Sequence, residues 1–318
     1  MDVAQYTSSS SELKNEDVRK IITSVVSALY NISPEKKHFI ILDGLDSVLG
    51  KREKQYDILA SLIRTANRMN HKFNELEIGT RIIILCRKDV LEKLNDPNRS
   101  KYIQDSGIEL NWYQSMSDVK NSNLYKLINL RAKNSLKKDI DVMDEFFPSE
   151  IYNKETFKHL VDNTRYTPRD LIQLMNYIQK ASYSKGATVQ TIKDGINAYS
   201  ENYFLMEVKD SVVGMLSNEE IETSFQAIRT IGLTEFSYQD FQKELPSPEK
   251  ALTMLNALYT AGAISNVDRE NGESFRVSKF RNPNSIFNEK KLIAVNPGLN
   301  KALMIHPPSK SKNESETS

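Results

Sequence analysis

The chain has 318 residues and a mass of 36.4 kDa, which exceeds one ordinary domain and is enough for two or three. Its 43 basic and 42 acidic side chains leave a formal net charge of +1, which excludes a globally basic nucleic-acid coat protein but not a local basic face. The single cysteine excludes an internal disulfide framework and a cysteine zinc site, and the four histidines lack metal-binding spacing. No apolar run is long enough to span a bilayer, and the N-terminus lacks the apolar core of a signal peptide. We therefore expect a cytoplasmic protein without a membrane partner.

Strands and helices alternate over the first third of the chain. The expected elements are a helix over 15–31, an apolar strand over 38–42 that ends in an acid, a helix over 53–73, the strand TRIIILC over 80–86, a short helix over 88–95 and the strand GIELNW over 107–112. Apolar runs of this kind are typical of parallel strands buried on both faces. The alternation therefore predicts βαβ units and an α/β domain over residues 1–118.

Strand patterns are missing from 119 to 205. Helical patterns cover 119–136, 139–146, 154–161, 168–183 and 188–203. The start at Pro168 is well specified, because Thr167 can cap the helix and proline suits its first position, while Asp170 complements the positive helix end. We expect an all-α domain over 119–205.

The segment from 206 to 304 combines helices with a hairpin. Helical patterns near 206–231, 237–244 and 248–261 precede two strand-like runs, 263–267 and 274–278. Asn271-Gly272 lies between these runs and is a strong hairpin signal. Helices followed by a terminal hairpin predict a winged-helix domain over 206–304, and the polar residues 305–318 predict a disordered tail.

The segment FIILDGLD contains two acids, Asp43 and Asp46, at and just beyond the end of an apolar strand. An acid in this place lies at the sheet edge where α/β proteins bind ligands. In P-loop NTPases it is the Walker B residue, which holds Mg²⁺ beside the nucleotide phosphates, and a second acid can orient or deprotonate the attacking water. The alternative is a strand followed by a polar turn, since Asp-Gly is common in turns.

A Walker B element requires a Walker A segment, G-x-x-x-x-G-K-[ST]. The nearest candidate, residues 44–52, has five residues between its glycines instead of four, and Arg52 stands where the metal-binding hydroxyl belongs. It would also place the Asp46 carboxylate against the phosphates. We reject it as a P-loop, so the sequence predicts ATPase activity only if another segment or chain supplies the Walker A.

The ordered set FIILDGLDSVL, TRIIILCRKDVL, GIELNW and TPRDLIQLMNYIQ, with FRNP (280–283) and LIAVNPGLNKAL (292–303), resembles the distal part of a bacterial STAND/AAA+-type P-loop ATPase over about residues 16–304. The resemblance implies half of an NTPase core, a helical lid and a winged helix. It implies a nucleotide-dependent switch or assembly module, with a role in anti-phage defence. ATP and Mg²⁺ would be the cofactors of the completed protein, with neither bound tightly to this chain alone.

The resemblance also assigns roles to residues of the first domain. Asp43 matches the Walker B metal ligand, and Asp46 matches the second acid of DGLD. Ser47 stands where NACHT-like relatives often have Glu, which argues against fast hydrolysis. Arg87 matches the sensor 1 region, where a polar group monitors the γ-phosphate; a strand-end arginine in solvent is the alternative.

In the second domain, Arg169 matches a sensor 2-like arginine at the start of a lid helix, and Arg165 is the weaker candidate. The resemblance implies that such a guanidinium reaches the nucleotide phosphates and couples the lid to the nucleotide state. An ordinary first-turn arginine near Asp170 is the alternative.

DNA is a candidate partner because of the predicted winged helix. Its expected recognition helix, PEKALTMLNALYTAGA, has Lys250 as its only basic residue, whereas a major-groove reader normally presents several basic or amide side chains. Basic residues gather only near the end, at Arg276, Lys279, Arg281, Lys290, Lys291 and Lys301. We therefore favour a packing or regulatory role, and keep a non-enzymatic DNA-binding regulator as an alternative.

A third hypothesis is a subunit that completes its NTPase site with another chain. A sheet without its P-loop strand would expose the apolar faces of the 38–42 and 80–86 strands. This predicts that the 1–118 region pairs with an N-terminal polypeptide that carries the Walker A, or with a second copy of this chain.

Overall fold

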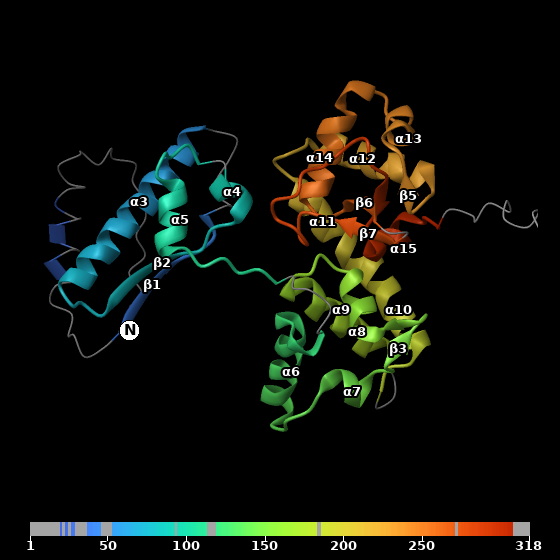
Figure 1. Cartoon of the computed structure of the whole chain (residues 1–318), viewed down its shortest axis with the longest axis horizontal. Helices are drawn as coiled ribbons and strands as arrows, with labels where there is room; N and C mark the ends of the chain where they lie inside the picture. The colour runs from blue at the N-terminus through green and yellow to red at the C-terminus, as the bar shows by residue number, and fades with distance from the viewer. Residues whose placement is uncertain are drawn as a thin grey trace, which may run out of the picture. The chain divides into compact units, whose positions relative to one another are not determined.

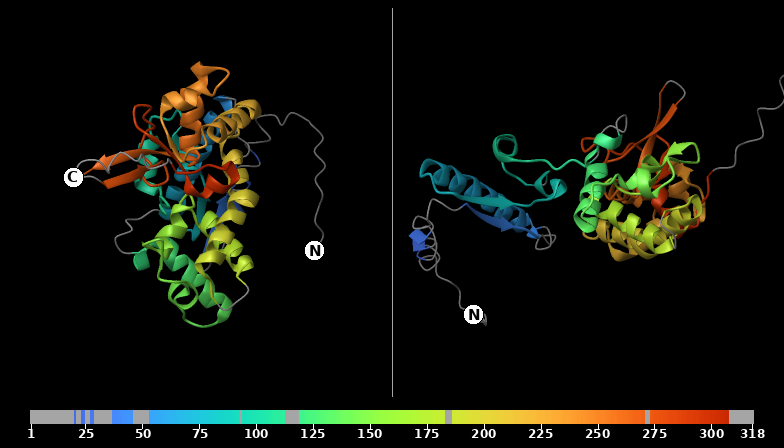
Figure 2. Two further views of the ribbon diagram at one scale, coloured as in Figure 1. Left: turned by 90° about the vertical axis from the view of Figure 1, so that its right-hand side faces the viewer. Right: turned by 90° about the horizontal axis from the view of Figure 1, so that it is seen from below.

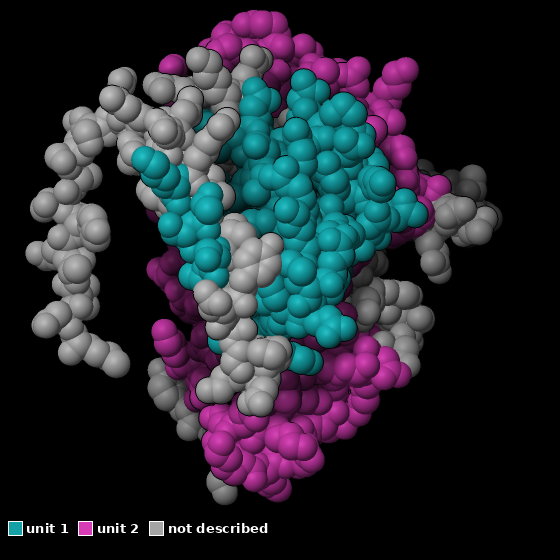
Figure 3. Space-filling model, turned by 90° about the vertical axis from the view of Figure 1, so that its left-hand side faces the viewer, with its two compact units in different colours: residues 1–109 teal, residues 110–318 magenta. Residues whose placement is uncertain are grey.

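The computed structural model describes residues 37–45, 53–92, 94–112, 119–182, 186–270 and 273–307, and five helical positions between residues 20 and 28. The predicted helix over 15–31 is helical at those five positions and otherwise lies outside the described residues, as do Asp46 and most of the predicted tail. Figure 1 shows the elements in chain order, and Figure 2 shows them from two further sides. The chain divides into two compact units, residues 1–109 and 110–318, which are coloured separately in Figure 3.

Unit 1 contains a parallel strand pair joined by a long helix. Strand β1 (His38–Leu42) pairs with β2 (Thr80–Ile84), and α3 (Glu53–Glu75) lies between them in the chain, so the three form the predicted βαβ unit (Figure 1). The side-chain amide of Asn70 on α3 both donates to the carbonyl of Ile82 and accepts from its N–H, each at 2.8 Å. The short helices α4 (Lys88–Glu92) and α5 (Arg99–Ser106) follow.

The predicted third strand over 107–112 is wrong. This stretch has no ladder partner among the described residues, and Ile108 and Leu110 are exposed. Their alternation with Glu109 and Asn111 imitates the period of a half-buried strand, but a strand also needs a neighbour with free backbone groups. Helix α5, which carries no buried residue, was not predicted because it lacks an apolar face.

The two strands of unit 1 are not buried on both faces. Phe39 is 59% exposed and Ile41 is 58% exposed, and Ile40, Ile83 and Leu85 are also exposed. The small core of the unit gathers instead around Leu59, Val90 and Leu94. Large apolar side chains therefore remain uncovered on the strand pair.

The first part of unit 2 is helical, as predicted. Its elements are η1 (Val119–Asn121), α6 (Asn123–Leu136), α7 (Val142–Phe146), β3 (Glu150–Ile151), β4 (Lys154–Glu155), α8 (Thr156–Asp162), α9 (Pro168–Ala181), α10 (Val189–Tyr199), the π-helix η2 (Ser200–Phe204) and α11 (Leu205–Val212). The predicted cap is confirmed, since the Thr167 side chain accepts from the Asp170 N–H. The all-α expectation needs one correction: β3 and β4 form a two-residue antiparallel pair.

The remainder of unit 2 contains α12 (Asn218–Ile231), β5 (Glu235–Phe236), α13 (Tyr238–Lys243), η3 (Pro248–Lys250), α14 (Ala251–Thr260), β6 (Ile264–Glu270), β7 (Glu273–Val277), β8 (Ile293–Val295), η4 (Pro297–Leu299) and α15 (Asn300–Leu303). The strands form an antiparallel sheet of order β5-β8-β6-β7. The predicted β6–β7 hairpin is confirmed, although its turn at 271–272 lies outside the described residues. The helix predicted over 206–231 is two helices, separated near Gly214, whose φ is +88°.

One hydrophobic core runs through unit 2. It contains Phe157 and Leu174 from the helical part, Phe225 and Leu258 from the later helices, and Leu303 close to the end, all with at most 1% exposure. Helices α10, η2 and α11 follow one another without a break from residue 189 to 212. The helical part and the sheet therefore pack as a single body. Within the described part of the chain, no helix is long and apolar enough to cross a membrane.

Candidate functional site

The carboxyl ends of β1 and β2 hold two of the predicted site residues. Asp43 directly follows β1, and Arg87 lies three residues beyond the end of β2. Because the strands are parallel, both residues emerge at the same edge, and both are exposed. One Asp43 carboxylate oxygen accepts the Gly44 N–H at 2.7 Å, and Gly44 has a φ of +73°. The structure thus places Asp43 and Arg87 where the sequence predicted, while Asp46 lies outside the described residues.

Asp43 is the described carboxylate that directly follows β1, and this bears on which metal could bind there. In the parts of the chain described above, no three His, Cys, Asp or Glu side chains group closely enough to hold an ion. Mg²⁺ in nucleotide sites is usually held by one or two carboxylates together with phosphates and water. Asp43 therefore fits Mg²⁺ that arrives with a nucleotide.

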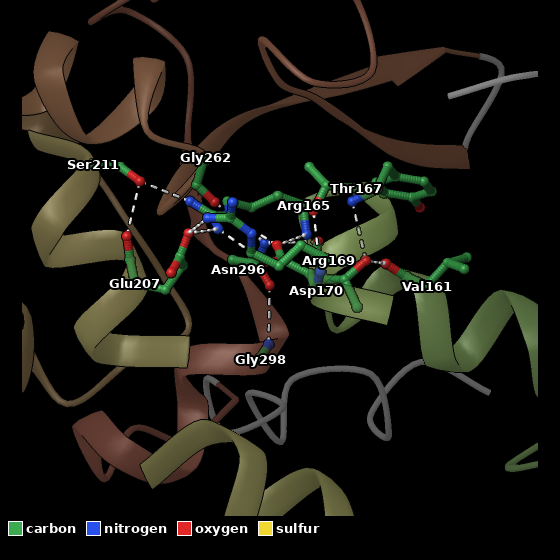
Figure 4. Close-up of polar contacts among 12 residues, drawn as sticks. Val161, Arg165, Thr167, Arg169, Asp170, Glu207, Ser211, Gly262, Asn296 and Gly298 are labelled. Atoms are coloured by element: carbon green, nitrogen blue, oxygen red, sulfur yellow. Dashed lines mark hydrogen bonds and ion pairs between the residues drawn. The ribbon is translucent and has the colours of Figure 1, made fainter. Parts of the chain in front are cut away.

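The densest polar network surrounds Arg165 in unit 2 (Figure 4). Its Nε and Nη2 donate to the two carboxylate oxygens of Asp170, each at 2.8 Å. Its Nη1 donates to the Ser211 hydroxyl at 2.8 Å, and Nη2 also lies 3.3 Å from the Glu207 carboxylate. The guanidinium therefore joins the start of α9 to α11.

The electrostatics of this network are those of a buried ion pair. Arg165 is 6% exposed and Asp170 is fully buried. Burial would lower the pKa of Arg165, but its hydrogen bond to Asp170 and the charges of Asp170 and Glu207 raise that pKa instead. The rings of Phe204 and Phe280 lie 5.7 Å and 5.8 Å from the guanidinium carbon. Arg165 therefore stays protonated, and these contacts hold its guanidinium in place.

Arg169, the first-ranked sensor 2 candidate, has a different environment. Its side chain is 74% exposed, and its Nη1 lies 3.3 Å from Glu207. Arg165 and Arg169 thus share one carboxylate, with Arg165 inside the fold and Arg169 at the surface. Of the two, Arg169 is the one with a guanidinium open to a ligand from outside.

Two polar groups of this region were missed by sequence reasoning. The Asn296 side chain donates to the carbonyls of Thr164 and Gly262, at 3.1 Å and 3.2 Å, and accepts the Gly298 N–H at 3.0 Å. Arg281 lies 2.6 Å from the Asp162 carboxylate. The sequence NPG at 296–298 signals a turn, but nothing in it indicates a partner more than 130 residues away.

Residues 122–205 of this chain match the FunZ-associated C-terminal helical domain. The matched segment runs from the cap of α6 to the first residue of α11, and it contains Arg165, Arg169 and Asp170. A protein of Escherichia coli strain K12, named "Putative transposon gamma-delta 80.3 kDa protein", is 22% identical over 308 residues. The aligned region covers 89% of this chain and 42% of that relative, so the chain spans less than half of the relative's length.

Proposed function

We propose that this chain is the C-terminal portion of a STAND/AAA+-like ATPase, in which it acts as a nucleotide-dependent switch or assembly module. The observation that carries the proposal is the parallel β1–β2 pair, which places Asp43 and Arg87 at one edge. This is the arrangement that a Walker B acid and a sensor 1 residue require. The relative's much greater length agrees with a protein whose other parts lie outside the aligned region.

In this proposal each residue has a limited task. Mg²⁺ bound with ATP would offset the phosphate charge, and the Asp43 carboxylate would hold that ion directly or through water. Asp46 would orient the attacking water, and Arg87 would respond to the γ-phosphate. The exposed guanidinium of Arg169 is available to a phosphate, whereas Arg165 stabilises the interior of unit 2 and is not a nucleotide ligand. An anti-phage role follows from the family resemblance alone.

A DNA-binding winged helix is the second candidate function. Two observations favour it: the helices α12 to α14 precede the β6–β7 hairpin, and the relative is named for a transposon. Helix α14 weighs against direct reading of bases, because it has no basic residue and buries six of its ten side chains. We therefore propose that this part of unit 2 has a packing or regulatory role rather than a DNA-binding one.

The test is hydrolysis by a complete ATPase, made by supplying a Walker A-bearing polypeptide. Asp43→Asn is nearly isosteric and removes only the charge, so we expect magnesium-dependent hydrolysis to fall by about tenfold or more with little change in folding. Asp57→Asn is the matched control, since Asp57 is an exposed carboxylate on α3. Full activity of Asp43→Asn with an unchanged magnesium requirement would show that Asp43 is not the Walker B acid.

A further inference from the structure

A cavity of about 410 Å³, partly open to solvent and lined by both polar and apolar surface, lies in unit 2 between α8 with its following loop and the β6–β7 hairpin. Its charged lining consists of Lys154, Asp162, Arg165, Arg276 and Arg281. The volume falls within the range of about 300–1,000 Å³ that is usual for small-ligand sites. All the lining residues belong to unit 2, so the cavity is independent of the Asp43 edge.

The carboxylate in the cavity does not balance its cations. The charge of Arg165 is neutralised within its own network, as described above. Asp162 is shared by two cations, since it pairs with Arg281 at 2.6 Å and also with Lys154. These neighbours hold the pKa of Asp162 below its ordinary value, although burial alone would raise it. Asp162 is therefore a full negative charge at neutral pH, and it is the carboxylate among the residues that line the cavity.

Arg276 lines the cavity without an ion pair of its own among the described residues, and Glu235 and Asp162 act on it only from beyond ion-pair distance. Its Nη1 donates to the backbone carbonyl of Val295 at 3.1 Å. Within the described ranges, no carboxylate lies within ion-pair distance of its guanidinium. Burial lowers the pKa of Arg276; Glu235 opposes this effect, and the nearby charge of Arg281 adds to it. A partly buried cation without an ion pair of its own is unfavourable, and a bound anion would relieve that cost.

Arg281 is already held in place for an anion. Its guanidinium carbon lies 4.8 Å from the centre of the Tyr166 ring, and its Nη2 lies 2.5 Å from the Tyr166 hydroxyl. The Tyr166 hydroxyl also contacts Asp162, which completes a fixed cluster. A preorganised guanidinium loses little conformational entropy when it binds. Because Nη2 already contacts Asp162 and Tyr166, Arg281 would meet an anion through its remaining N–H groups and its charge.

We propose that this cavity binds a phosphomonoester dianion, with the guanidinium groups of Arg276 and Arg281 as its main ligands. Apart from Arg165, whose charge Asp170 compensates, the lining has three cations and one carboxylate, a net charge of +2 that Glu235 moderates from outside the lining. A phosphate monoester carries about −1.5 to −2 charges at pH 7, whereas a carboxylate would meet only one of these positive charges. Orthophosphate, a nucleoside monophosphate and the 5′-phosphate of a nucleic-acid strand share this chemistry.

The experiment is calorimetric titration of the whole chain at constant ionic strength, in EDTA so that magnesium-dependent nucleotide binding does not contribute. The probes are orthophosphate, AMP and a short DNA strand with a 5′-phosphate, with adenosine and the unphosphorylated strand as controls. We expect the phosphorylated probes to bind with dissociation constants below about 1 mM and their controls to bind at least about tenfold more weakly. The tightest of the three identifies the source of the phosphate.

The variant Arg276→Gln removes the charge that has no ion pair of its own, and we expect it to weaken binding by about tenfold or more. Arg269→Gln is the matched control, because Arg269 is exposed on the neighbouring strand β6, and it should bind as the unchanged chain does. Equal affinity of Arg276→Gln and the unchanged chain would overturn the proposal, as would the absence of binding by every phosphorylated probe.

A second measurement needs no variant and remains decisive if Arg276→Gln does not fold. Hydrogen exchange of the unchanged chain, with and without saturating probe, should show slower exchange over 162–166 and 276–281. Protection confined to other segments would place the bound phosphate elsewhere and overturn the proposal.

Discussion

Arg165 and Arg169 lie four residues apart and contact the same carboxylate, yet they differ in what they contribute. Arg165 is buried and paired with a fully buried Asp170, whereas Arg169 is exposed and meets only Glu207. Removing one member of a buried ion pair leaves the other charge without compensation, while an exposed pair is weakened by solvent. Arg165, the weaker sensor 2 candidate, is therefore the arginine that matters more for the stability of the fold.

This difference gives a prediction for stability. Arg165→Met should lower the free energy of unfolding by about 3–5 kcal/mol, because Asp170 remains buried and unpaired. Arg169→Met removes an exposed cation of the same size and should cost less than about 1 kcal/mol. Urea unfolding followed by circular dichroism measures both. Similar losses for the two variants would show that Arg165 is not the residue that holds α9 to α11.

His159 gives a prediction for pH dependence. Burial lowers its pKa, and the charge of Lys154 adds to this effect, while Asp162 opposes it. The folded state therefore binds the proton less readily than the unfolded state, so stability is full above the unfolded pKa of about 6.5 and is lost as pH falls towards the lower folded pKa.

The pH prediction is tested by chemical denaturation at pH 8 and pH 5.5. His159→Gln should reduce the stability lost between the two pH values, while His71→Gln, at an exposed position on α3, should leave that loss unchanged. A pH response that His159→Gln does not alter would contradict the account of this residue.

The sequence predicted the place of Asp43 and Arg87 because both follow apolar strands, and strand ends share an edge in a parallel sheet. It ranked Arg169 above Arg165 but could not tell which of the two is buried. Which of the two is buried depends on Glu207 and Ser211, about 40 residues further along the chain. The cavity around Arg276 was missed for the same reason, since its cations come from segments that lie far apart in the sequence.

At the scale of elements, local signals decided what could be predicted. Helix α9 was placed from Thr167 and Pro168 because cap and first turn are adjacent in the chain. Strands β5 and β8 have two and three residues, too few to show a period, and they form only because the sheet offers them partners. The 107–112 stretch shows the converse, since its alternating pattern finds no such partner in the part of the chain that the structure describes.

The contact of α9 with α10 gives an element-scale prediction. Gly195 is buried in α10, and a Cβ there would lie 2.6 Å from the Cα of Ile178 on α9. Alanine favours a helix over glycine by about 1 kcal/mol. Its Cβ would, however, overlap with the backbone of α9, and the two helices would have to move apart to accommodate it. Gly195→Ala should therefore destabilise unit 2 by about 1–3 kcal/mol, as measured by thermal unfolding.

Gly186→Ala is the matched control for this substitution. A Cβ at Gly186 would come no closer than 3.4 Å to its nearest neighbour, the carbonyl of Phe146. We expect its effect to stay within about 0.5 kcal/mol. Stabilisation by Gly195→Ala would show that helix propensity outweighs the close approach.

For the whole molecule, the two units differ in how well they are covered. Unit 2 has one continuous core, whereas Phe39 and Ile41 of unit 1 are more than half exposed. Burying each such side chain contributes about 1.5–3 kcal/mol, so an uncovered strand pair is a strong driving force for association. The sequence predicted these strands as apolar, and the structure adds that nothing described in unit 1 covers them.

We therefore predict that the chain associates through unit 1, with itself or with a Walker A-bearing polypeptide. Light scattering at low micromolar concentration should show species larger than the monomer. Ile41→Ser should shift the chain towards monomer, while Ile286→Ser, at an isoleucine of unit 2 that is 82% exposed against 58% for Ile41, should not. A monomer that melts cooperatively without any partner would refute this prediction.

We have proposed that this chain holds the Walker B side of a nucleotide site and that a separate segment supplies the Walker A. Calorimetric titration with Mg²⁺–ATP tests it most directly, performed on the chain alone and on the chain mixed with a Walker A-bearing polypeptide. P-loop amides and lysine supply most phosphate contacts, so we expect binding at about micromolar concentration only in the mixture. Micromolar Mg²⁺–ATP affinity of the chain alone, or no gain on mixing, would contradict the account.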